Sequence, residues 1–128
     1  MDETGFNHDY PLTVLAQLGD AVHYLYTIEA KMASINKSSQ LHDVVAYTVS
    51  AINQANLLAM LKPVLSELEL DLIRRARNFR SIKKTKIKQS VYRMATAFEV
   101  LYGYLYLNDK HRLNYLNDLC QNFEGSTD

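Results

Sequence analysis

The chain has 128 residues and no formal net charge, because 14 Lys and Arg balance 14 Asp and Glu. Its length predicts one domain over residues 1–128, too small for two separate cores. The scarcity of Gly and Pro, the absence of Trp and long periodic apolar segments predict an all-helical fold without strands. No uninterrupted apolar run reaches the length of a membrane span, and an acidic N-terminus is unlike a signal peptide. We therefore expect a soluble, cytoplasmic protein with no membrane partner, and the single cysteine, Cys120, fits a reducing compartment.

About six or more helices are expected between residues 11 and 123, with frayed termini at 1–9 and 124–128. The first should run from Pro11, a favourable first-turn residue, to about Met32. Asp20 lies roughly opposite an apolar stripe on this helix, so the helix should be central and make contacts on both sides. The stripe consists of Leu15, Leu18, Val22 and Leu25.

A second long helix is predicted from Ser38 or Ser39, either of which would cap it, to about Leu61, with Pro63 ending it. Its apolar side carries Leu41, Val45, Thr48, Ile52 and Ala55.

Ser66 and Glu69 have the spacing of a capping box and should open a third helix that ends near Asn78. The side chains of this helix expected to point inward are Leu68, Leu72 and Ile73.

Residues 79–88 show little helical periodicity and predict a loop that orders on a ligand. Ser90 could cap the next helix, which reaches about Asn108 and is followed by a last helix over residues 110–123. Tyr102, Tyr104 and Tyr106 are expected at a core edge or a subunit interface, with base stacking as the less favoured role.

Two nearly uncharged stretches, residues 10–28 and 94–108, each contain one carboxylate, Asp20 and Glu99. If both stretches are core helices, each buries an acid whose unpaired desolvation is costly. Packing of the two helices would let the acids face one another, with a bound cation, a shared proton or a basic partner as compensation. Small residues four positions before and after Glu99, Ala95 and Gly103, should leave space beside it. Asp20 and Glu99 are therefore candidates for metal-assisted chemistry, and the alternative is a structural role as buried caps or bridges.

Nine of the fourteen basic residues lie between Arg74 and Arg93, with no Asp or Glu among them. Such a basic cluster is the electrostatic footprint of a polyphosphate partner, and the alternative is a solvated basic loop. The cluster consists of Arg74, Arg75, Arg77, Arg80, Lys83, Lys84, Lys86, Lys88 and Arg93.

Other common sites have no signature in this sequence. The four histidines, His8, His23, His42 and His111, lack metal-ligand spacing, so a zinc site is disfavoured and surface or packing roles are expected. Neither a glycine-rich phosphate loop nor a Gly-x-Ser-x-Gly elbow occurs, which disfavours the common nucleotide-binding folds and the serine hydrolases.

Residues 15–22, Leu-Ala-Gln-Leu-Gly-Asp-Ala-Val, resemble the signature helix of ribonuclease III, and residues 97–105 resemble its second catalytic helix. Four further motifs, in order along the chain, are similar to the Mini-ribonuclease III family of bacteria, and the resemblance covers about residues 11–123. They are Leu-His at 41–42, Val-Ser-Ala at 49–51 with Gln-Ala at 54–55, Arg-Ala-Arg-Asn at 75–78, and Tyr-Arg-Met-Ala-Thr-Ala-Phe-Glu at 92–99.

The resemblance implies an all-helical, ribonuclease III-type endonuclease domain that forms a homodimer and cuts double-stranded RNA with a divalent metal, normally Mg²⁺, with Mn²⁺ as a substitute. It implies Asp20 and Glu99 as metal-binding catalytic acids, and a precursor of large-subunit (23S) ribosomal RNA as substrate. Full-length ribonuclease III enzymes carry two further acids where this chain has Ala16 and Thr96, a reduction that Mini-ribonuclease III shares. The metal site is therefore expected to be lean and completed by RNA phosphate oxygens.

No appended double-stranded RNA-binding domain is expected, so the catalytic domain should hold its own substrate. Recognition should depend mainly on A-form shape, phosphates and 2′-hydroxyls. The candidate RNA-binding residues are the nine residues of the basic cluster and Asn78.

Two other functions remain open at this point. One is a catalytically silent helical module that binds structured RNA or the ribosome through the same basic cluster, against which the presence of both acids argues. The other is a protein-interaction domain whose basic run only increases solubility, which would show no salt-sensitive RNA binding.

Overall fold

A computed structural model of the protein describes residues 10–78 and 88–123. Its elements are α1 (Leu12–Met32), α2 (Ser38–Thr48), α3 (Ala51–Leu61), the short 3-10 helix η1 (Lys62–Val64), α4 (Glu67–Arg77), α5 (Gln89–Asn108) and α6 (Lys110–Gln121). The all-helical prediction is confirmed. The termini predicted to fray, at 1–9 and 124–128, and residues 79–87 of the predicted loop lie outside the described residues.

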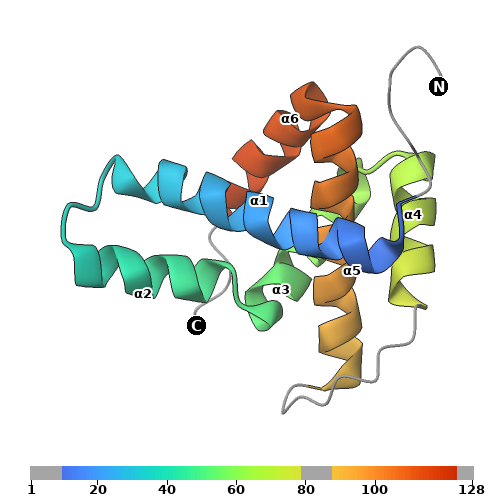
Figure 1. Ribbon diagram of the computed structural model, residues 1–128, viewed down its shortest axis with the longest axis horizontal. Coiled ribbons are helices and arrows are strands. Elements are labelled where there is room, and N and C mark those ends of the chain that lie inside the picture. Colours follow the sequence, from blue (N-terminus) through green and yellow to red (C-terminus); the bar gives the residue numbers. More distant parts are fainter. Residues whose placement is uncertain (1–9, 79–87, 124–128) are drawn as a thin grey trace.

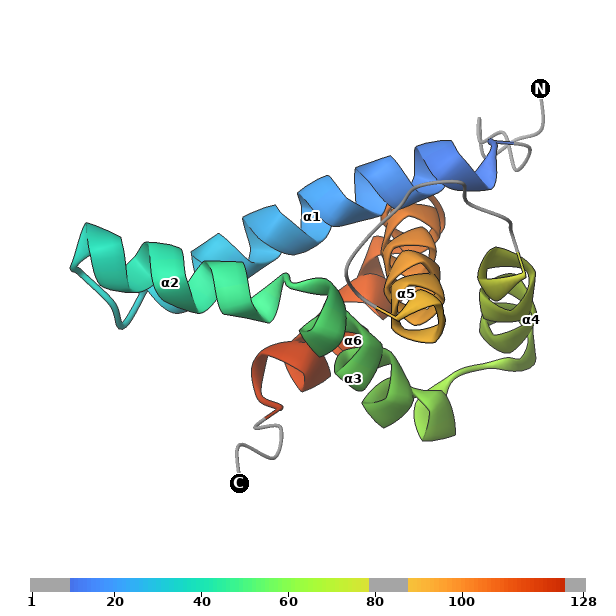
Figure 2. The same cartoon turned by 90° about the horizontal axis from the view of Figure 1, so that it is seen from below.

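Helix α5 is the centre of the fold. Figure 1 shows α1 running across α5, and Figure 2, which views α5 nearly end-on, shows α4 on one side of it and α3 below. Helix α2 runs back along the C-terminal half of α1 and projects from the rest of the molecule in both views. The core is built around α5, whose Phe98, Leu101 and Tyr102 are fully buried. A site placed on α5 can therefore be reached from α1, α3 and α4.

The crossing of α1 over α5 depends on two glycines. A Cβ atom added to Gly19 would overlap the backbone carbonyl of Glu99, and one added to Gly103 would overlap the backbone carbonyl of Leu15. Glycine in a helix interior costs about 1 kcal/mol relative to alanine, so these positions are explained by the close approach that they permit. The expectation that Gly103 leaves free space beside Glu99 is wrong, because the backbone of α1 fills that space.

The predicted second long helix is two helices, α2 and α3. Ser50 begins α3 as its N-cap and accepts a hydrogen bond from the backbone N–H of Asn53 at 3.2 Å. The Asn53 side chain in turn donates to the carbonyl oxygen of Thr48 at 2.8 Å. These bonds satisfy backbone groups that the break exposes, so the chain turns where the apolar pattern alone predicts continuity.

The predicted caps and inward faces were partly wrong. The N-cap residues of α2 and α5 are Lys37 and Lys88, without side-chain cap bonds, so the serines expected as caps, Ser38 or Ser39 and Ser90, lie inside the helices. The backbone conformation before α2 and α5 determines where each helix starts. A serine in the sequence caps a helix only if the preceding turn places its side chain next to the free backbone N–H groups. Three apolar side chains expected to face inward are largely exposed because no neighbouring helix covers them: Leu25 at 49%, Ile52 at 58% and Leu68 at 58%.

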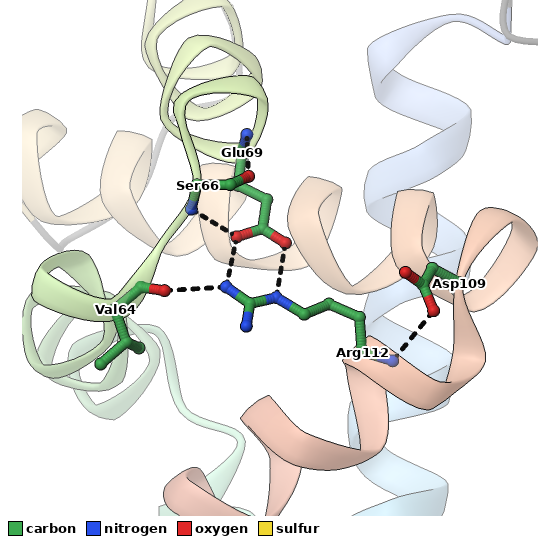
Figure 3. Close-up of polar contacts among 5 residues, drawn as sticks. All are labelled: Val64, Ser66, Glu69, Asp109 and Arg112. Atoms are coloured by element: carbon green, nitrogen blue, oxygen red, sulfur yellow. Dashed lines mark hydrogen bonds and ion pairs between the residues drawn. The ribbon is translucent and has the colours of Figure 1, made fainter.

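The predicted capping box at the start of α4 is confirmed. Ser66 Oγ accepts from the Glu69 N–H, and a Glu69 carboxylate oxygen accepts from the Ser66 N–H at 2.8 Å. Arg112 of α6 donates to both Glu69 oxygens, at 2.8 and 2.9 Å, and to the Val64 carbonyl (Figure 3). Burial alone would raise the pKa of Glu69, but the bonds from Arg112 and Ser66 outweigh it and lower that pKa. This ion pair fixes the entrance of α4 against α6.

Near the other end of α6, Cys120 is buried, and burial raises the pKa of its thiol to about 12. Tyr102 of α5 donates a hydrogen bond to the Asn117 side chain at 2.8 Å, which joins α5 to α6.

Among the described helices, none is long and apolar enough by itself to cross a membrane. Helices α2 and α3 with η1 would meet that test only as a pair, and they are bent by 58° where they join.

Candidate active site

A cavity of about 410 Å³ opens where α1, α3, α4 and α5 meet, and it contains both predicted acids. Asp20 enters it from α1 and Glu99 from α5. The packing of these two helices therefore places the acids at one site, as their isolation in the sequence predicted.

The expectation that both acids are buried is wrong. Asp20 is exposed and Glu99 is half-buried, and the cavity that both line is partly open to solvent. Water can solvate the carboxylates there, so the fold does not bear the full desolvation cost of two buried like charges. The acids remain close enough to the core for their backbones to be fixed by it.

The glycine crossing sets the position of this pair. Gly19 immediately precedes Asp20, and the atom that its missing side chain would strike belongs to Glu99 itself. Each acid therefore sits at the point of closest approach of the two helices, and a displacement of either helix would change the relation between the two carboxylates.

The remaining lining supplies oxygen atoms and one cation. Thr13 and Gln17 of α1 and Thr96 of α5 line the cavity, and Thr96 donates its hydroxyl proton to the Tyr92 carbonyl at 3.0 Å. Arg93 brings the only basic side chain among the described lining residues. Ala16 also lines the cavity. The two positions that resemble the sites of further acids in full-length ribonuclease III enzymes, 16 and 96, therefore line it without a carboxylate.

These oxygen atoms suit Mg²⁺ better than a metal that requires three or more protein ligands. Within residues 10–78 and 88–123, no three His, Cys, Asp or Glu side chains gather at one point. Mg²⁺ uses oxygen ligands and retains several waters, so two carboxylates together with phosphate oxygens of a substrate are sufficient.

Gln54 of α3 lines the same cavity although only 2% of its surface is exposed. Its side-chain nitrogen lies 3.1 Å from Nδ1 of His23, a fully buried residue of α1. The sequence predicted no role for Gln54, and it placed His23 at the surface or in packing. The available signal was a glutamine on the face of α3 that otherwise carries Leu57, Leu58 and Leu61 into the core.

The basic cluster is divided by the structure. Arg93 lies in the cavity wall, and Arg77, Asn78 and Lys88 are exposed. Arg74 and Arg75 are both paired with Asp71, at 2.7 and 3.3 Å, just outside the acid-free stretch. Four predicted RNA-binding residues lie outside the described residues: Arg80, Lys83, Lys84 and Lys86.

Comparison with known proteins identifies the family of this chain. Residues 13–110 match the family model described as the ribonuclease III domain. Mini-ribonuclease 3 of Gloeobacter violaceus is 38% identical over 88% of this chain and 84% of its own length. Mini-ribonuclease 3 of Brevibacillus brevis is 46% identical over 76% and 74%, and that of Streptococcus pneumoniae is 38% identical over 87% and 91%.

A crystal structure of a Fusobacterium nucleatum protein superimposes with a TM-score of 0.78, covering 88% of this chain and 92% of that one at 24% sequence identity. At that level of identity the likeness shows the fold alone. The matched family model extends through both helices that carry the acids. Together with the relatives, it places the chain in the ribonuclease III domain family, among the Mini-ribonuclease 3 proteins, as an endoribonuclease.

Proposed function

We propose that this endoribonuclease cleaves double-stranded RNA at the cavity between α1 and α5, with Asp20 and Glu99 as its metal-binding catalytic acids. The observation that carries this assignment is the convergence of the two acids on one open cavity across a glycine-dependent helix crossing. Mg²⁺ is the expected ion, with Mn²⁺ as a substitute, because the lining offers oxygen atoms and the described residues form no soft-ligand cluster.

Each side chain has a distinct task in this proposal. Asp20 and Glu99 would hold the ion through their carboxylate oxygens, beside the scissile phosphate. Arg93 binds a phosphate oxygen and keeps the strand in line for attack. The bound ion supplies polarisation of the phosphate and a lower pKa for the attacking water. The water oxygen forms the new bond to phosphorus as the bridging oxygen leaves, so the protein forms no covalent intermediate.

The basic cluster is proposed to hold the RNA backbone. Arg77 and Lys88 flank the segment 79–87, which contains the four basic residues outside the described part of the chain, and both are exposed. Their position at the end of α4 and the start of α5 brings them to the side of the fold that carries the cavity. Because a phosphate backbone is recognised by charge and shape, this arrangement suits an A-form duplex without base readout.

A homodimer is proposed because cutting both strands of a duplex in one encounter requires two such sites related by a two-fold axis. The exposed apolar side chains of α1 and α2 supply the contact surface: Tyr24, Leu25, Met32 and Tyr47. Sedimentation at micromolar concentration checks this point, and a fully active monomer would exclude it. By its Mini-ribonuclease III relationship, the proposed natural substrate is the precursor of 23S ribosomal RNA.

The decisive experiment combines Asp20→Asn and Glu99→Gln with cleavage of a long RNA duplex, in Mg²⁺ and in excess chelator. Each change is nearly isosteric but removes one charge from the metal site, so turnover should fall at least about a hundredfold while duplex binding persists. Asp118→Asn, an exposed acid on α6, is the control and should cut normally. Near wild-type cleavage by either site variant at saturating RNA and Mg²⁺ would contradict the assignment. Loss of cleavage by all three would point to damage unrelated to the site.

A further inference from the structure

We infer that Gln54 is a positioning residue of the active site: His23 anchors its amide nitrogen, and its amide oxygen accepts a hydrogen bond from an O–H donor in the cavity. The inference rests on the proposed function, since it takes the cavity of Asp20 and Glu99 as the place of reaction.

The hydrogen bond to His23 fixes the orientation of the amide. Gln54 Nε2 lies 3.1 Å from His23 Nδ1, and an amide nitrogen only donates, so Nδ1 is the acceptor and the ring proton is on Nε2. The nitrogen of Gln54 is thereby occupied. Its oxygen, the other end of the same amide, has no hydrogen-bond partner among the described residues.

The Gln54 side chain lines the cavity, so its oxygen lies next to open space. Among the described residues, the fully enclosed side-chain polar atoms without a partner are His23 Nε2 and Gln121 Oε1, and the Gln54 oxygen is not one of them. Gln54 is nevertheless 98% buried, and the space that it lines is the cavity that also contains Asp20 and Glu99. The cavity is therefore the described space that this oxygen can reach.

The ring of His23 is itself packed against α5. The His23 ring makes edge contacts with Phe98 and Tyr102, with centroids 4.8 and 5.1 Å away. His23 lies three residues after Asp20, and Phe98 immediately precedes Glu99. Through these contacts, the position of the Gln54 amide is fixed relative to the two helix segments that carry the acids.

This arrangement is costly for stability, which argues for a function. The chain encloses a neutral imidazole whose Nε2–H has no partner in residues 10–78 and 88–123, and unsatisfied buried donors are rare and destabilising. A leucine and a methionine in place of His23 and Gln54 would fill similar space without that cost. Departures from local rules of this kind concentrate at functional sites.

The test compares Gln54→Met with Gln121→Met. Gln121 is also a partly enclosed glutamine that contacts α1, through Thr27 at 3.1 Å, but it lies outside the cavity. Gln54→Met should lower kcat about tenfold or more, with KM and duplex affinity measured in Ca²⁺ changed less than about twofold, because a misplaced reacting group costs rate rather than binding. Gln121→Met should leave kcat unchanged at a comparable shift in Tm. Equal kcat values for the two variants would overturn the inference, as would an equal loss of duplex affinity and kcat in Gln54→Met.

His23→Leu tests the anchor. It should lower kcat in the same direction, and the double variant His23→Leu/Gln54→Met should be no slower than Gln54→Met, because His23 acts only through Gln54. If the fold losses of kcat in the two single variants multiply in the double variant, His23 does not act through Gln54. In ¹H–¹⁵N spectra, the Gln54 side-chain amide protons should be protected from exchange in the wild type and unprotected in His23→Leu. Should Gln54→Met fail to fold, His23→Leu and this spectrum decide the question.

The source of the O–H donor is either a cavity water or a ribose 2′-hydroxyl of the RNA. A duplex with a 2′-deoxy nucleotide at the cut position separates them. If the donor is a water, the ratio of wild-type kcat to Gln54→Met kcat should be the same on that duplex. If the donor is the 2′-hydroxyl, the ratio should fall to about one there. Asp20→Asn distinguishes the two levels of failure: if it remains active, the proposed site is wrong, and if it is inactive while Gln54→Met is normal, only the role of Gln54 is wrong.

Discussion

His23 is a fully buried imidazole whose ring is held between helices α1 and α5. Burial lowers its pKa from 6.5 to about 4, so the ring is neutral in the folded protein at neutral pH. Between those two values the unfolded chain binds a proton that the folded chain does not. The resulting stability is fully present above pH 6.5 and is lost as the pH falls toward 4.

The His23 contribution can be measured by denaturant unfolding. Between about pH 7 and about pH 4.5, wild-type protein should lose about 2 kcal/mol more stability than His23→Leu, which has no group to protonate at that position. The leucine variant controls for carboxylates that titrate over the same range. Parallel losses in the two proteins would mean that the folded chain protonates His23 without penalty.

For individual residues, the sequence predicted the candidate acids but not their surroundings. Asp20 and Glu99 stand out because each is the sole charge of a long apolar stretch, and that signal is local. Their exposure depends on where α3 and α4 leave the cavity open, which periodicity along one helix does not contain. The pairing of Gln54 with His23 joins residues 31 positions apart in the sequence, and no spacing rule within one helix reveals it.

The close packing of α1 against α5 depends on Gly19, and so does the site. Gly19→Ala would drive a Cβ into the Glu99 backbone and force α1 away from α5. Despite the better helix propensity of alanine, we expect a net loss of about 1–3 kcal/mol and a marked loss of cleavage, because the two acids separate. Thermal unfolding and single-turnover cleavage measure the two effects.

Ala21→Gly is the matched control for this variant. Ala21 is an exposed residue of the same helix two positions away, and glycine there should cost about 1 kcal/mol without moving the crossing. The two variants should therefore have similar stabilities and different activities. If both retain activity, the crossing does not set the geometry of the acids.

The ion pair at the start of α4 supports a second element-scale prediction. Arg112→Ala leaves the buried Glu69 carboxylate without its charged partner and should cost about 3 kcal/mol. Arg74→Ala breaks a pair of exposed side chains with Asp71 and should cost less than about 1 kcal/mol. Urea unfolding of both variants gives the comparison, and equal losses would show that burial of Glu69 adds nothing to the pair.

Element boundaries were predictable where a short sequence signal marks them, as Pro11 marks the start of α1 without a side-chain cap bond. The box formed by Ser66 and Glu69 is complete within four residues, and its spacing identified the start of α4 correctly. The break between α2 and α3 is also stabilised locally, by Ser50 and Asn53, but the apolar pattern continues through it and masks the signal. Exposure of Leu25, Ile52 and Leu68 is a property of the assembled helices, so it could not be read from any one of them.

The affinity of the protein for RNA should decrease with salt concentration, because the exposed residues of the basic cluster neutralise phosphates. Replacing Arg77 and Lys88 with Gln should reduce the slope of log affinity against log salt by about 0.7–0.9 for each phosphate that is no longer neutralised. Replacing Arg74 and Arg75 should change it less, because Asp71 already neutralises one of their charges. Fluorescence anisotropy with a labelled duplex from low to moderate salt provides the slopes.

Two outcomes would contradict this assignment of the cluster. An unchanged slope and affinity in the variant at positions 77 and 88 would remove those residues from the interface. A changed slope in Asp20→Asn would mean that the acid contacts the bulk of the RNA backbone, whereas a metal-binding acid should leave the slope unaltered while lowering turnover.

The buried thiol of Cys120 makes this chain convenient for site-specific labelling. Maleimides and other alkylating reagents attack the thiolate, and a thiol with a pKa of about 12 and little exposure offers almost none at neutral pH. Since the sequence has no other cysteine, one introduced at an exposed position such as Tyr47 would accept a fluorophore or spin label without prior removal of Cys120. Conversely, alkylation of the native thiol requires its region of α6 to open, so the reaction rate of Cys120 measures local unfolding of that part of the helix.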